Sequence, residues 1–516
     1  MLVKNAAKMW AGRMTSGQGH CPAGDEPSPV AQNRTTLEIR GDDRPMEIHT
    51  VSSQLSRHGR DWAPSSGGIE WPGSRSVRKP SMSCSAFHSS QLTRRRFLSL
   101  SGLAMTSVAT GIGAAGGKTA GKLPIEEAFD GAMTAFMSAR GVPGGSLAVA
   151  AGGRLVFVSG YGFADRAARR PVEPESRFRI ASISKPITAI AVLRLVEQGR
   201  LSLDARVVPL LKVEPFLPGG RKVDLFLDKI TVRHLLQHTG GWDRDKTFDP
   251  MFRSRWIAER LGVACPAGNG DIIRFMFGRP LDFEPGTRYA YSNFGYCVLG
   301  RVIERVTGRG YEAFVRDEIL APIGVRHMRV GASLPAGRAP GEVQYYTPDD
   351  ERAESVFATP PVKVPVPDGG FCLETMDAHG GWIASATDLV RVATALTLER
   401  PGALLKDETL RTMLAPPPAP VARRTDGSLQ DWWYGCGWSV RPVKDGGVHS
   451  WHSGSLPGTF TLLVRRADGV TWAALFNQRS NDKRLPDDAI DSALHRAVDS
   501  VQEWPREDLF RTAASQ

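Results

Sequence analysis

An extended stretch meets the first turn of a long apolar helix at Phe178-Arg179-Ile180-Ala181-Ser182-Ile183-Ser184-Lys185-Pro186-Ile187-Thr188. The apolar pattern predicts a helix from about Ser182 to Gln198. Pro186 falls in the first turn of this helix, where a missing N–H matters least. Because residues three apart share one face of a helix, we expect the Lys185 amine to lie beside the Ser182 hydroxyl.

This pair has the residue types of a nucleophile and its base. A serine hydroxyl is a weak nucleophile until a base takes its proton, and a buried lysine with a neutral amine can do so. Ser-x-x-Lys spacing alone proves little, because Ser76…Lys79 and Ser480…Lys483 also match. Ser76 lies in an unpatterned leader and Ser480 in a polar turn. Ser182 begins a helix, whose N-terminal N–H groups favour developing negative charge. The alternative, a capping serine with a lysine on a solvated face, fits this apolar helix poorly.

Strand patterns occur at both ends of the body of the chain, and helical patterns fill the middle. Gly152-Gly153 and Ala467-Asp468-Gly469 separate pairs of apolar stretches and predict two β-hairpins. We therefore predict an α+β fold, an α/β sandwich: an antiparallel sheet built from N- and C-terminal segments, with flanking helices and an inserted all-helical domain. The predicted elements are helices at Ile125–Arg140 and Asp487–Ser500 and strands at Ser146–Ala151, Leu155–Ser159, Trp438–Val440, Thr459–Arg465 and Thr471–Asn477. Residues 501–516 are expected to form a tail.

A second motif follows in the middle of the chain. Tyr291-x-Asn293 is the only Tyr-x-Asn among eight tyrosines. A phenol can relay a proton between a serine, a lysine and a leaving group. The Asn293 amide can donate to a substrate carbonyl and can also steady Lys185. The alternative is a core tyrosine followed by an asparagine turn.

These motifs, in this order, resemble the serine β-lactamase and penicillin-binding protein superfamily. The resemblance is stronger to the branch of class C β-lactamases, D-aminopeptidases and related esterases. Three further stretches agree with that branch: Ile230–Gly241, Phe283-Glu284-Pro285-Gly286 and Gly380–Ser385. The resemblance covers about Leu123 to Ala497, so residues 123–500 are expected to form one β-lactamase-related serine hydrolase domain. It leaves open whether Lys185 or a Tyr291 phenolate is the base.

The third motif departs from that family. His452-Ser453-Gly454-Ser455 stands where the family carries Lys-Thr-Gly on an edge strand. The resemblance implies that the backbone N–H groups of Ser182 and Ser455 form an oxyanion hole, and that Ser453 and Gly454 bind substrate. His452 is mostly neutral at pH 7, so it can relay a proton or bind a less charged substrate. The alternative is a structural histidine. We expect strong hydrolysis of penicillins and cephalosporins to be absent.

The motifs favour a serine hydrolase, an esterase or an amidase-peptidase, that acts through an acyl-enzyme on a small-molecule or peptide substrate. The alternatives are a β-lactamase or D,D-carboxypeptidase, and a non-catalytic binding or sensing module on the same fold. No cofactor and no metal are implied, because no Cys/His cluster has zinc spacing. The oligomeric state is left open.

Most of the +11 net charge of the 516 residues lies before Gly121, which argues against nucleic-acid binding. Thr93-Arg94-Arg95-Arg96-Phe97-Leu98 precedes an uncharged stretch to Gly117. This pattern predicts a twin-arginine-type signal peptide at residues 93–120, and hence a periplasmic or secreted protein. The stretch is too short and too rich in Gly, Ser and Thr for a stable membrane span. Residues 1–92 are expected to be an unstructured extension, and a start at Met82 would leave residues 1–81 untranslated.

Six cysteines occur, and none forms a C-x-x-C pair. Four of them would survive export: Cys265, Cys297, Cys372 and Cys436. Disulfides in an oxidising compartment and four buried free thiols are both compatible with the sequence.

Overall fold

The computed structural model describes residues 124–396, 403–444 and 446–512. The extension predicted at residues 1–92 and the signal peptide predicted at residues 93–120 lie outside the described residues. Among those residues, all four cysteines are free thiols, so the disulfide alternative does not hold. None of the helices in the described ranges is long and apolar enough to cross a membrane.

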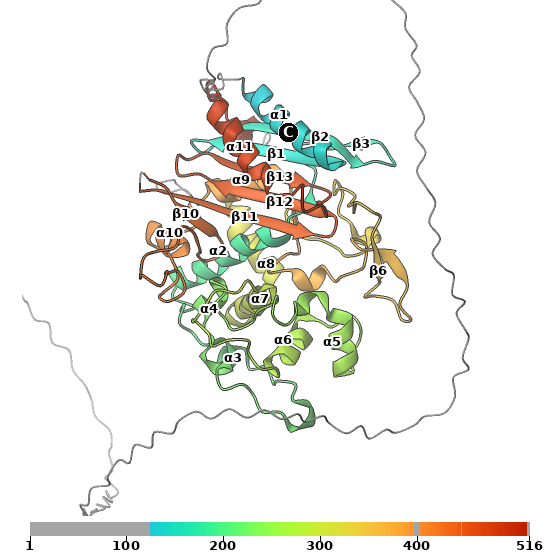
Figure 1. The fold of residues 1–516 in the computed structure, drawn as a ribbon, viewed down its shortest axis with the longest axis vertical. Coiled ribbons are helices and arrows are strands. Elements are labelled where there is room, and N and C mark those ends of the chain that lie inside the picture. Colours follow the sequence, from blue (N-terminus) through green and yellow to red (C-terminus); the bar gives the residue numbers. More distant parts are fainter. Residues whose placement is uncertain (1–123, 397–402, 445, 513–516) are drawn as a thin grey trace, which may run out of the picture. The chain divides into compact units, whose positions relative to one another are not determined.

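An eight-stranded antiparallel sheet forms the centre of the fold (Figure 1), with strand order β3-β2-β1-β13-β12-β11-β10-β9. Strand β1 pairs with β13, so segments from the two ends of the domain share one sheet, as predicted. Both predicted hairpin turns are confirmed, and Gly152 and Gly153 take the positive φ angles that a tight turn requires. The strands are β1 (Gly144–Ala151), β2 (Arg154–Asp165), β3 (Arg170–Pro171), β9 (Trp433–Tyr434), β10 (Ser439–Pro442), β11 (Val448–Leu456), β12 (Thr459–Arg465) and β13 (Thr471–Phe476).

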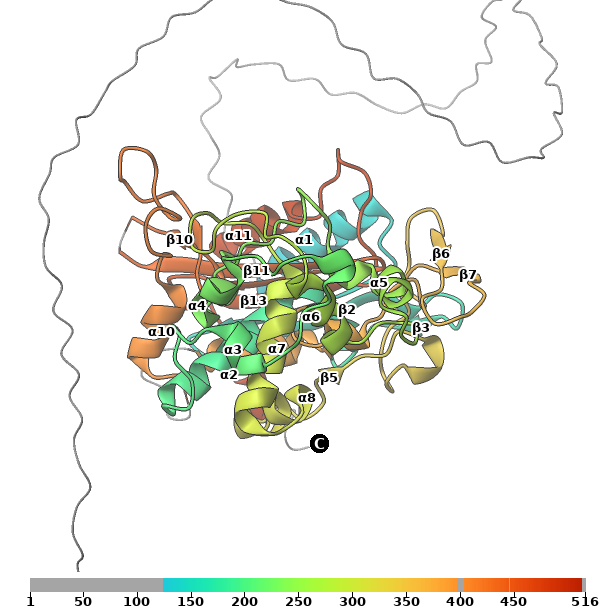
Figure 2. The same ribbon diagram turned by 90° about the horizontal axis from the view of Figure 1, so that it is seen from below.

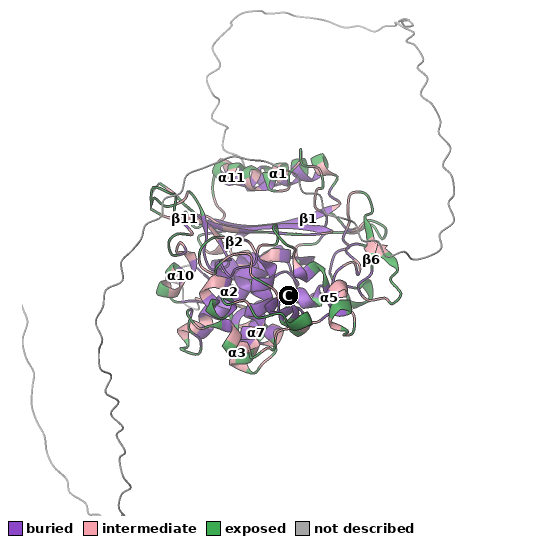
Figure 3. Ribbon diagram, turned by 60° about the horizontal axis from the view of Figure 1, so that its bottom comes forward, coloured by how far each residue is buried: buried purple, intermediate pink, exposed green. Residues whose placement is uncertain are grey.

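Helices cover both faces of this sheet, and Figure 3 shows it nearly edge-on between them. Helices α1 (Ile125–Arg140) and α11 (Ala489–Ser500) pack on the outer face, where Phe129 of α1 shares a core with Val149 of β1 and Trp472 of β13. Helices α2 (Ser184–Glu197) and α9 (Ala386–Thr394) lie on the inner face. The two cores make the α/β sandwich, and the predicted fold class is confirmed.

The inserted region carries strands as well as helices, so the expectation of an all-helical domain is wrong. Its helices are α3 (Val207–Leu211), α4 (Val232–Leu236), α5 (Ser254–Leu261), α6 (Asn269–Phe277), α7 (Asn293–Thr307), α8 (Tyr311–Val315) and α10 (Asp407–Leu414). Strands β4 (Phe178–Arg179), β8 (Trp382–Ala384) and β5 (Arg329–Val330) form a small sheet, and β6 (Arg352–Glu354) pairs with β7 (Lys363–Pro365). Such strands are too short to show an alternating pattern. Figure 2 shows β6–β7 and α10 at opposite sides of this region.

The segment after Ser500, expected to be a tail, contains a packed helix, α12 (Leu509–Thr512). Phe510 is buried, and the Arg391 guanidinium lies 4.1 Å from its ring centroid. The backbone N–H of Leu155 in β2 donates to Asp508 Oδ1 at 3.1 Å. One buried aromatic in a single helical turn produces no periodic signal, which is why the sequence pattern did not predict this helix.

Candidate active site

A strained turn presents Ser182. It lies in a 3₁₀ turn, η1 (Ala181–Ile183), just before α2, so the regular helix begins two residues later than predicted. Ala181 has a φ of +48°, a conformation that costs a residue with a side chain about 1–3 kcal/mol. Neighbouring strands hold the turn in place: the N–H of Ile180 donates to the carbonyl of Trp382 at 2.9 Å, and its carbonyl accepts from Thr461 Oγ1 at 2.9 Å. The hydroxyl is therefore presented at a rigid position.

Lys185 is completely buried next to this hydroxyl. Its Nζ lies 3.0 Å from Ser182 Oγ and donates to Asn293 Oδ1 at 2.7 Å and to the carbonyl oxygen of His379 at 2.9 Å. A neutral amine has two N–H groups and one lone pair. Two carbonyl oxygens accept the hydrogens, so the lone pair faces the serine hydroxyl. This is the arrangement required of a base.

Burial lowers the pKa of Lys185 well below its usual value, because the interior disfavours the ammonium. The charge of Asp249 acts in the opposite direction and raises this pKa, while the Arg244 guanidinium lowers it. The net direction is toward the neutral amine.

Tyr291 lies on the other side of the nucleophile. Its hydroxyl donates to Ser182 Oγ at 2.8 Å. Burial raises the pKa of Tyr291, so the phenol keeps its proton. Its ring is covered by the His238 ring, with centroids 4.3 Å apart, and by the Arg244 guanidinium at 4.5 Å. Tyr291 is thus a protonated phenol that donates a hydrogen bond to Ser182 Oγ.

The Asn293 amide has a defined orientation. Its Nδ2 donates to Asp249 Oδ2 at 2.6 Å, which turns Oδ1 toward Lys185. One of the two amide hydrogens is therefore used inside the protein, and the other remains for the expected contact with a substrate carbonyl.

Both ring nitrogens of His452 have partners within the protein. Its Nδ1 lies 2.7 Å from the carbonyl oxygen of Ser453, and its Nε2 lies 2.9 Å from the Tyr434 hydroxyl. Since a carbonyl can only accept, Nδ1 carries the hydrogen and Nε2 accepts from Tyr434. Burial lowers the pKa of His452 to about 3. The ring is neutral at pH 7 and bonds Tyr434, while its centroid lies 6.4 Å from that of Tyr291.

Strand β11 approaches the nucleophile through a glycine. A Cβ on Gly454 would collide with the carbonyl of Ile180 and with Thr461 Oγ1, so the residue permits close approach. The Ser453 side chain lines a cavity on the outer face of the sheet, and contact of Ser453 with a substrate stays a prediction. Side chains alternate along a strand, so His452 and Gly454 face the site while Ser453 does not. Ser455 is also exposed, and its Oγ accepts from Arg479 at 3.3 Å.

The sequence matches the family model described as Beta-lactamase over residues 129–497. The chain belongs to the β-lactamase family. The match begins in α1 and ends in α11, so it contains both halves of the sheet and the inserted region.

Relatives within the β-lactamase family carry different names. Penicillin-binding protein 4* of Bacillus subtilis is 26% identical over 356 residues, which cover 68% of this chain and 71% of that protein. Esterase EstB of Burkholderia gladioli is 33% identical over 251 residues, 48% of this chain and 59% of its own length.

Solved structures show the same β-lactamase-type fold. The octameric penicillin-binding protein homologue from Pyrococcus abyssi superposes with a TM-score of 0.57 at 24% identity, over 74% of this chain and 80% of that one. The D-amino acid amidase from Ochrobactrum anthropi gives 0.54 at 23% identity, over 73% and 98%.

The sequence motifs did not predict a role for several residues of this site. Tyr434 is one of them, and its hydroxyl bonds His452 Nε2. His238 belongs to a quoted stretch but had no role, and its ring lies against both Tyr291 and Tyr434. Asp249 and Arg244 lie in a loop, and neither belongs to a recognisable sequence motif. Within the described ranges, no three His, Cys, Asp or Glu side chains cluster as metal ligands would.

We expect two loop variants to shift the pH profile in opposite directions. If Lys185 is the base of an acylation step, that step needs the neutral amine, so kcat/KM rises as pH passes the pKa of Lys185. Arg244 lowers this pKa and Asp249 raises it. Arg244→Gln should therefore move the acidic limb of the kcat/KM profile to higher pH, and Asp249→Asn should move it to lower pH. Arg221→Gln, at an exposed position, is the control. Shifts of both variants in the same direction would contradict the assignment.

Gly454→Ala is expected to reduce both activity and stability. The added methyl must push β11 away from the turn at Ile180, which we expect to cost about 1–3 kcal/mol of unfolding free energy. Gly131→Ala in α1 is the matched control, because its Cβ meets no atom within 4 Å and alanine favours a helix by about 0.5–1 kcal/mol. Thermal unfolding and ester turnover measure both effects. An unchanged Gly454→Ala protein would show that close approach is not required.

Proposed function

We propose that this protein is a serine hydrolase that acts through an acyl-enzyme on an ester or amide substrate. The observation that carries the proposal is the position of Ser182 Oγ, 3.0 Å from Lys185 Nζ and 2.8 Å from the Tyr291 hydroxyl. A nucleophile between a buried base and a proton donor has the parts that acyl transfer requires. Relatives named as an esterase and as an amidase support the same reaction class.

Acylation divides the proton transfers between two residues. Lys185 takes the Ser182 proton as Oγ bonds to the substrate carbonyl carbon. Tyr291 then donates its proton to the departing oxygen or nitrogen as that bond breaks, and the Lys185 ammonium returns a proton to Tyr291. Water repeats the sequence on the acyl-enzyme and releases the acid. The lowered pKa of Lys185 and the raised pKa of Tyr291 favour these roles over a Tyr291 phenolate base.

The proposed oxyanion hole uses the backbone N–H groups of Ser182 and Ser455. Pairing between β10 and β11 ends at Trp451, so the edge of β11 beyond it is not used by β10. Gly454 brings this edge against the turn that holds Ser182. Each donor to a tetrahedral oxyanion contributes about 3–4 kcal/mol to catalysis in comparable enzymes.

We predict weak activity on penicillins and cephalosporins. His452 is neutral at pH 7, whereas β-lactamases use a lysine at the matching place to hold the substrate carboxylate. Turnover of a chromogenic cephalosporin by purified protein should be at least about 100-fold below turnover of a p-nitrophenyl ester. Rapid cephalosporin turnover would instead favour the β-lactamase alternative.

A fluorophosphonate probe tests the proposal directly. Such a probe phosphonylates an activated serine, so intact-mass analysis should show one adduct, and peptide mapping should place it on Ser182. Panels of p-nitrophenyl esters, D-amino-acid amides and a cephalosporin then identify the reaction. A folded protein without any adduct would support a non-catalytic binding module.

We also propose that residues 93–120 are a twin-arginine-type export signal and that the mature protein is periplasmic or secreted. The arginine run followed by Phe97-Leu98 and an uncharged stretch supports this assignment. N-terminal sequencing of the mature protein should find a start near residue 120. A peptide from residues 1–80 in the unprocessed precursor would contradict a start at Met82.

A further inference from the structure

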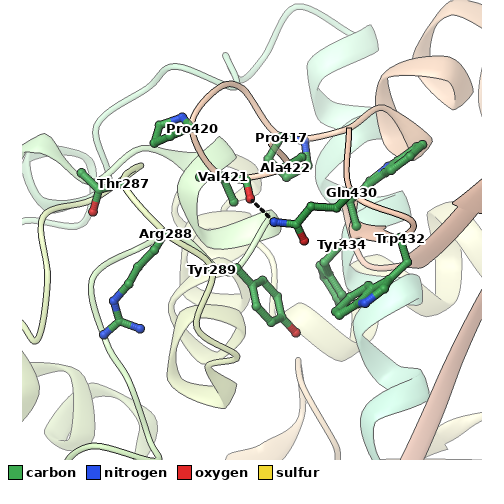
Figure 4. A pocket seen from close by; sticks show the side chains of 11 residues that line it. Thr287, Arg288, Tyr289, Pro417, Pro420, Val421, Ala422, Gln430, Trp432 and Tyr434 are labelled. Atoms are coloured by element: carbon green, nitrogen blue, oxygen red, sulfur yellow. Dashed lines mark hydrogen bonds between the residues drawn. The ribbon is translucent and has the colours of Figure 1, made fainter. Parts of the chain in front are cut away.

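A cavity of about 310 Å³ lies between the segment at residues 287–289 and the segment at residues 417–434 (Figure 4). One wall comes from the segment that leads to Tyr291, and its main side chain is Tyr289. The other comes from the segment before β10, which contributes Val421, Trp432 and Tyr434. Trp432 is 43% exposed, so the cavity opens to solvent at this side chain.

Tyr434 and Tyr289 line the cavity and also lie close to residues around Ser182. The Tyr434 hydroxyl bonds His452 Nε2 at 2.9 Å, and the Tyr434 and Tyr291 ring centroids lie 6.4 Å apart. Tyr289 is two residues before Tyr291, and its ring lies 6.0 Å from that of Tyr434. The cavity therefore borders the Tyr291 side of Ser182. A leaving group must lie on this side, because Tyr291 is the proposed donor of its proton.

The lining is aromatic and aliphatic, and most of its polar groups are already bonded. The Tyr289 and Trp432 rings meet edge to face, with centroids 5.9 Å apart. The Gln430 amide donates to the carbonyl of Val421 at 3.3 Å, as Figure 4 shows. Thr287 Oγ1 donates to the carbonyl of Glu284 at 2.7 Å. These contacts leave ring faces and methyl groups as the main contact surface for a ligand.

The charged side chain at the rim of the cavity disfavours charged ligands. Arg288 is the one charged side chain in the lining, and it forms an ion pair with Asp243 at 2.9 Å. Its guanidinium also stacks on the Phe283 ring at 4.1 Å. The cation disfavours an ammonium group beside it, and its existing partner leaves little attraction for a carboxylate. Burial raises the pKa of Tyr289 to about 12, so this phenol contributes no charge at pH 7.

We infer that this cavity receives the leaving group of the substrate, and that this group is an uncharged aromatic or branched apolar alcohol or amine. The inference rests on the proposed hydrolase function and makes it specific. Tyr289, Val421 and Trp432 are then specificity-determining residues, and the acyl part of the substrate lies outside the cavity.

Two ester series test the inference in the full-length protein. In the first series the acyl group is constant and the leaving group changes from ethyl to 1-naphthyl. In the second the leaving group is p-nitrophenyl and the acid grows in size. The variants are Trp432→Ala, which removes one wall, Trp432→Phe, which keeps an aromatic wall, and Val421→Trp, which fills the cavity. Leu429→Ala, an exposed apolar residue of the same loop, is the control.

We expect Trp432→Ala and Val421→Trp to lower the naphthyl-to-ethyl ratio of kcat/KM by roughly tenfold or more relative to wild type, the scale of small size differences in apolar pockets. Intrinsic ester reactivity cancels in this comparison. Trp432→Phe should keep most of the ratio, and Leu429→Ala should match wild type. An unchanged ratio, or sensitivity confined to the acyl series, would overturn the inference. Absence of fluorophosphonate labelling in wild type would instead show that the proposed function has failed.

Discussion

Ser182→Ala is expected to lower kcat on the best ester substrate by at least about 10⁴-fold and to abolish fluorophosphonate labelling. Alanine removes the oxygen that Lys185 and Tyr291 both contact, at 3.0 and 2.8 Å. Residual turnover would come from binding and from the oxyanion donors alone. The measurement is steady-state kinetics together with intact-mass analysis of the labelled protein.

The chain offers a matched control for this variant. Ser480 and Lys483 have the same spacing as Ser182 and Lys185, but they lie in an irregular segment after β13. The Ser480 hydroxyl accepts from the N–H of Asp482 at 3.1 Å, and Lys483 is exposed. The double variant Ser480→Ala with Lys483→Ala should keep wild-type kinetics. Activity that survives in Ser182→Ala, or that disappears in this control, would contradict the assignment.

Lys185→Met is expected to reduce acylation by at least about 10³-fold while the protein still folds. Methionine has nearly the same length as lysine but provides no lone pair on nitrogen. It leaves Asn293 Oδ1 and the His379 carbonyl without their donor, which we expect to cost about 1–3 kcal/mol of stability. Stopped-flow labelling and thermal unfolding separate the chemical effect from the structural one.

Lys185→Arg distinguishes a base from a fixed cation. A guanidinium does not lose its proton at ordinary pH, so arginine can keep the charge but cannot accept the serine proton. If Lys185 acts as the base, this variant should be as inactive as Lys185→Met. Substantial activity in Lys185→Arg would instead favour a charge that holds Tyr291 as the phenolate base.

Long elements with strong periodicity were predicted well. Helix α1 and strand β12 have the predicted bounds, because one face of α1 is buried at helical spacing and β12 is a continuous run of buried residues before Arg465. Short elements were not predicted. Strand β8 is buried at all three positions, and α12 makes one turn, so neither repeats long enough to show a period.

The surroundings of the proposed catalytic residues depend on contacts between distant segments. Asp249 is 44 residues from Asn293, and the His379 carbonyl is 194 residues from the Lys185 amine that it accepts from. No spacing rule relates such positions, because α7 and the loop before β8 are brought to α2 by packing of the inserted region. The Ser453 side chain points to the opposite face of the sheet from the side chain of His452, and the strand register that decides this is known only from the structure.

The sequence by itself determined the class of fold and the residues at its proposed centre. Ordered motifs around Ser182, Lys185 and Tyr291 are local patterns, and hydrophobic periodicity places them on particular elements. Tertiary structure alone decided how these groups act. Burial of Lys185 and its two carbonyl acceptors favour the neutral amine that the proposed base requires. Burial likewise keeps His452 neutral, and its Nε2 bonds Tyr434. Protonation depends on the complete surroundings of a group, and those exist only after the chain has packed.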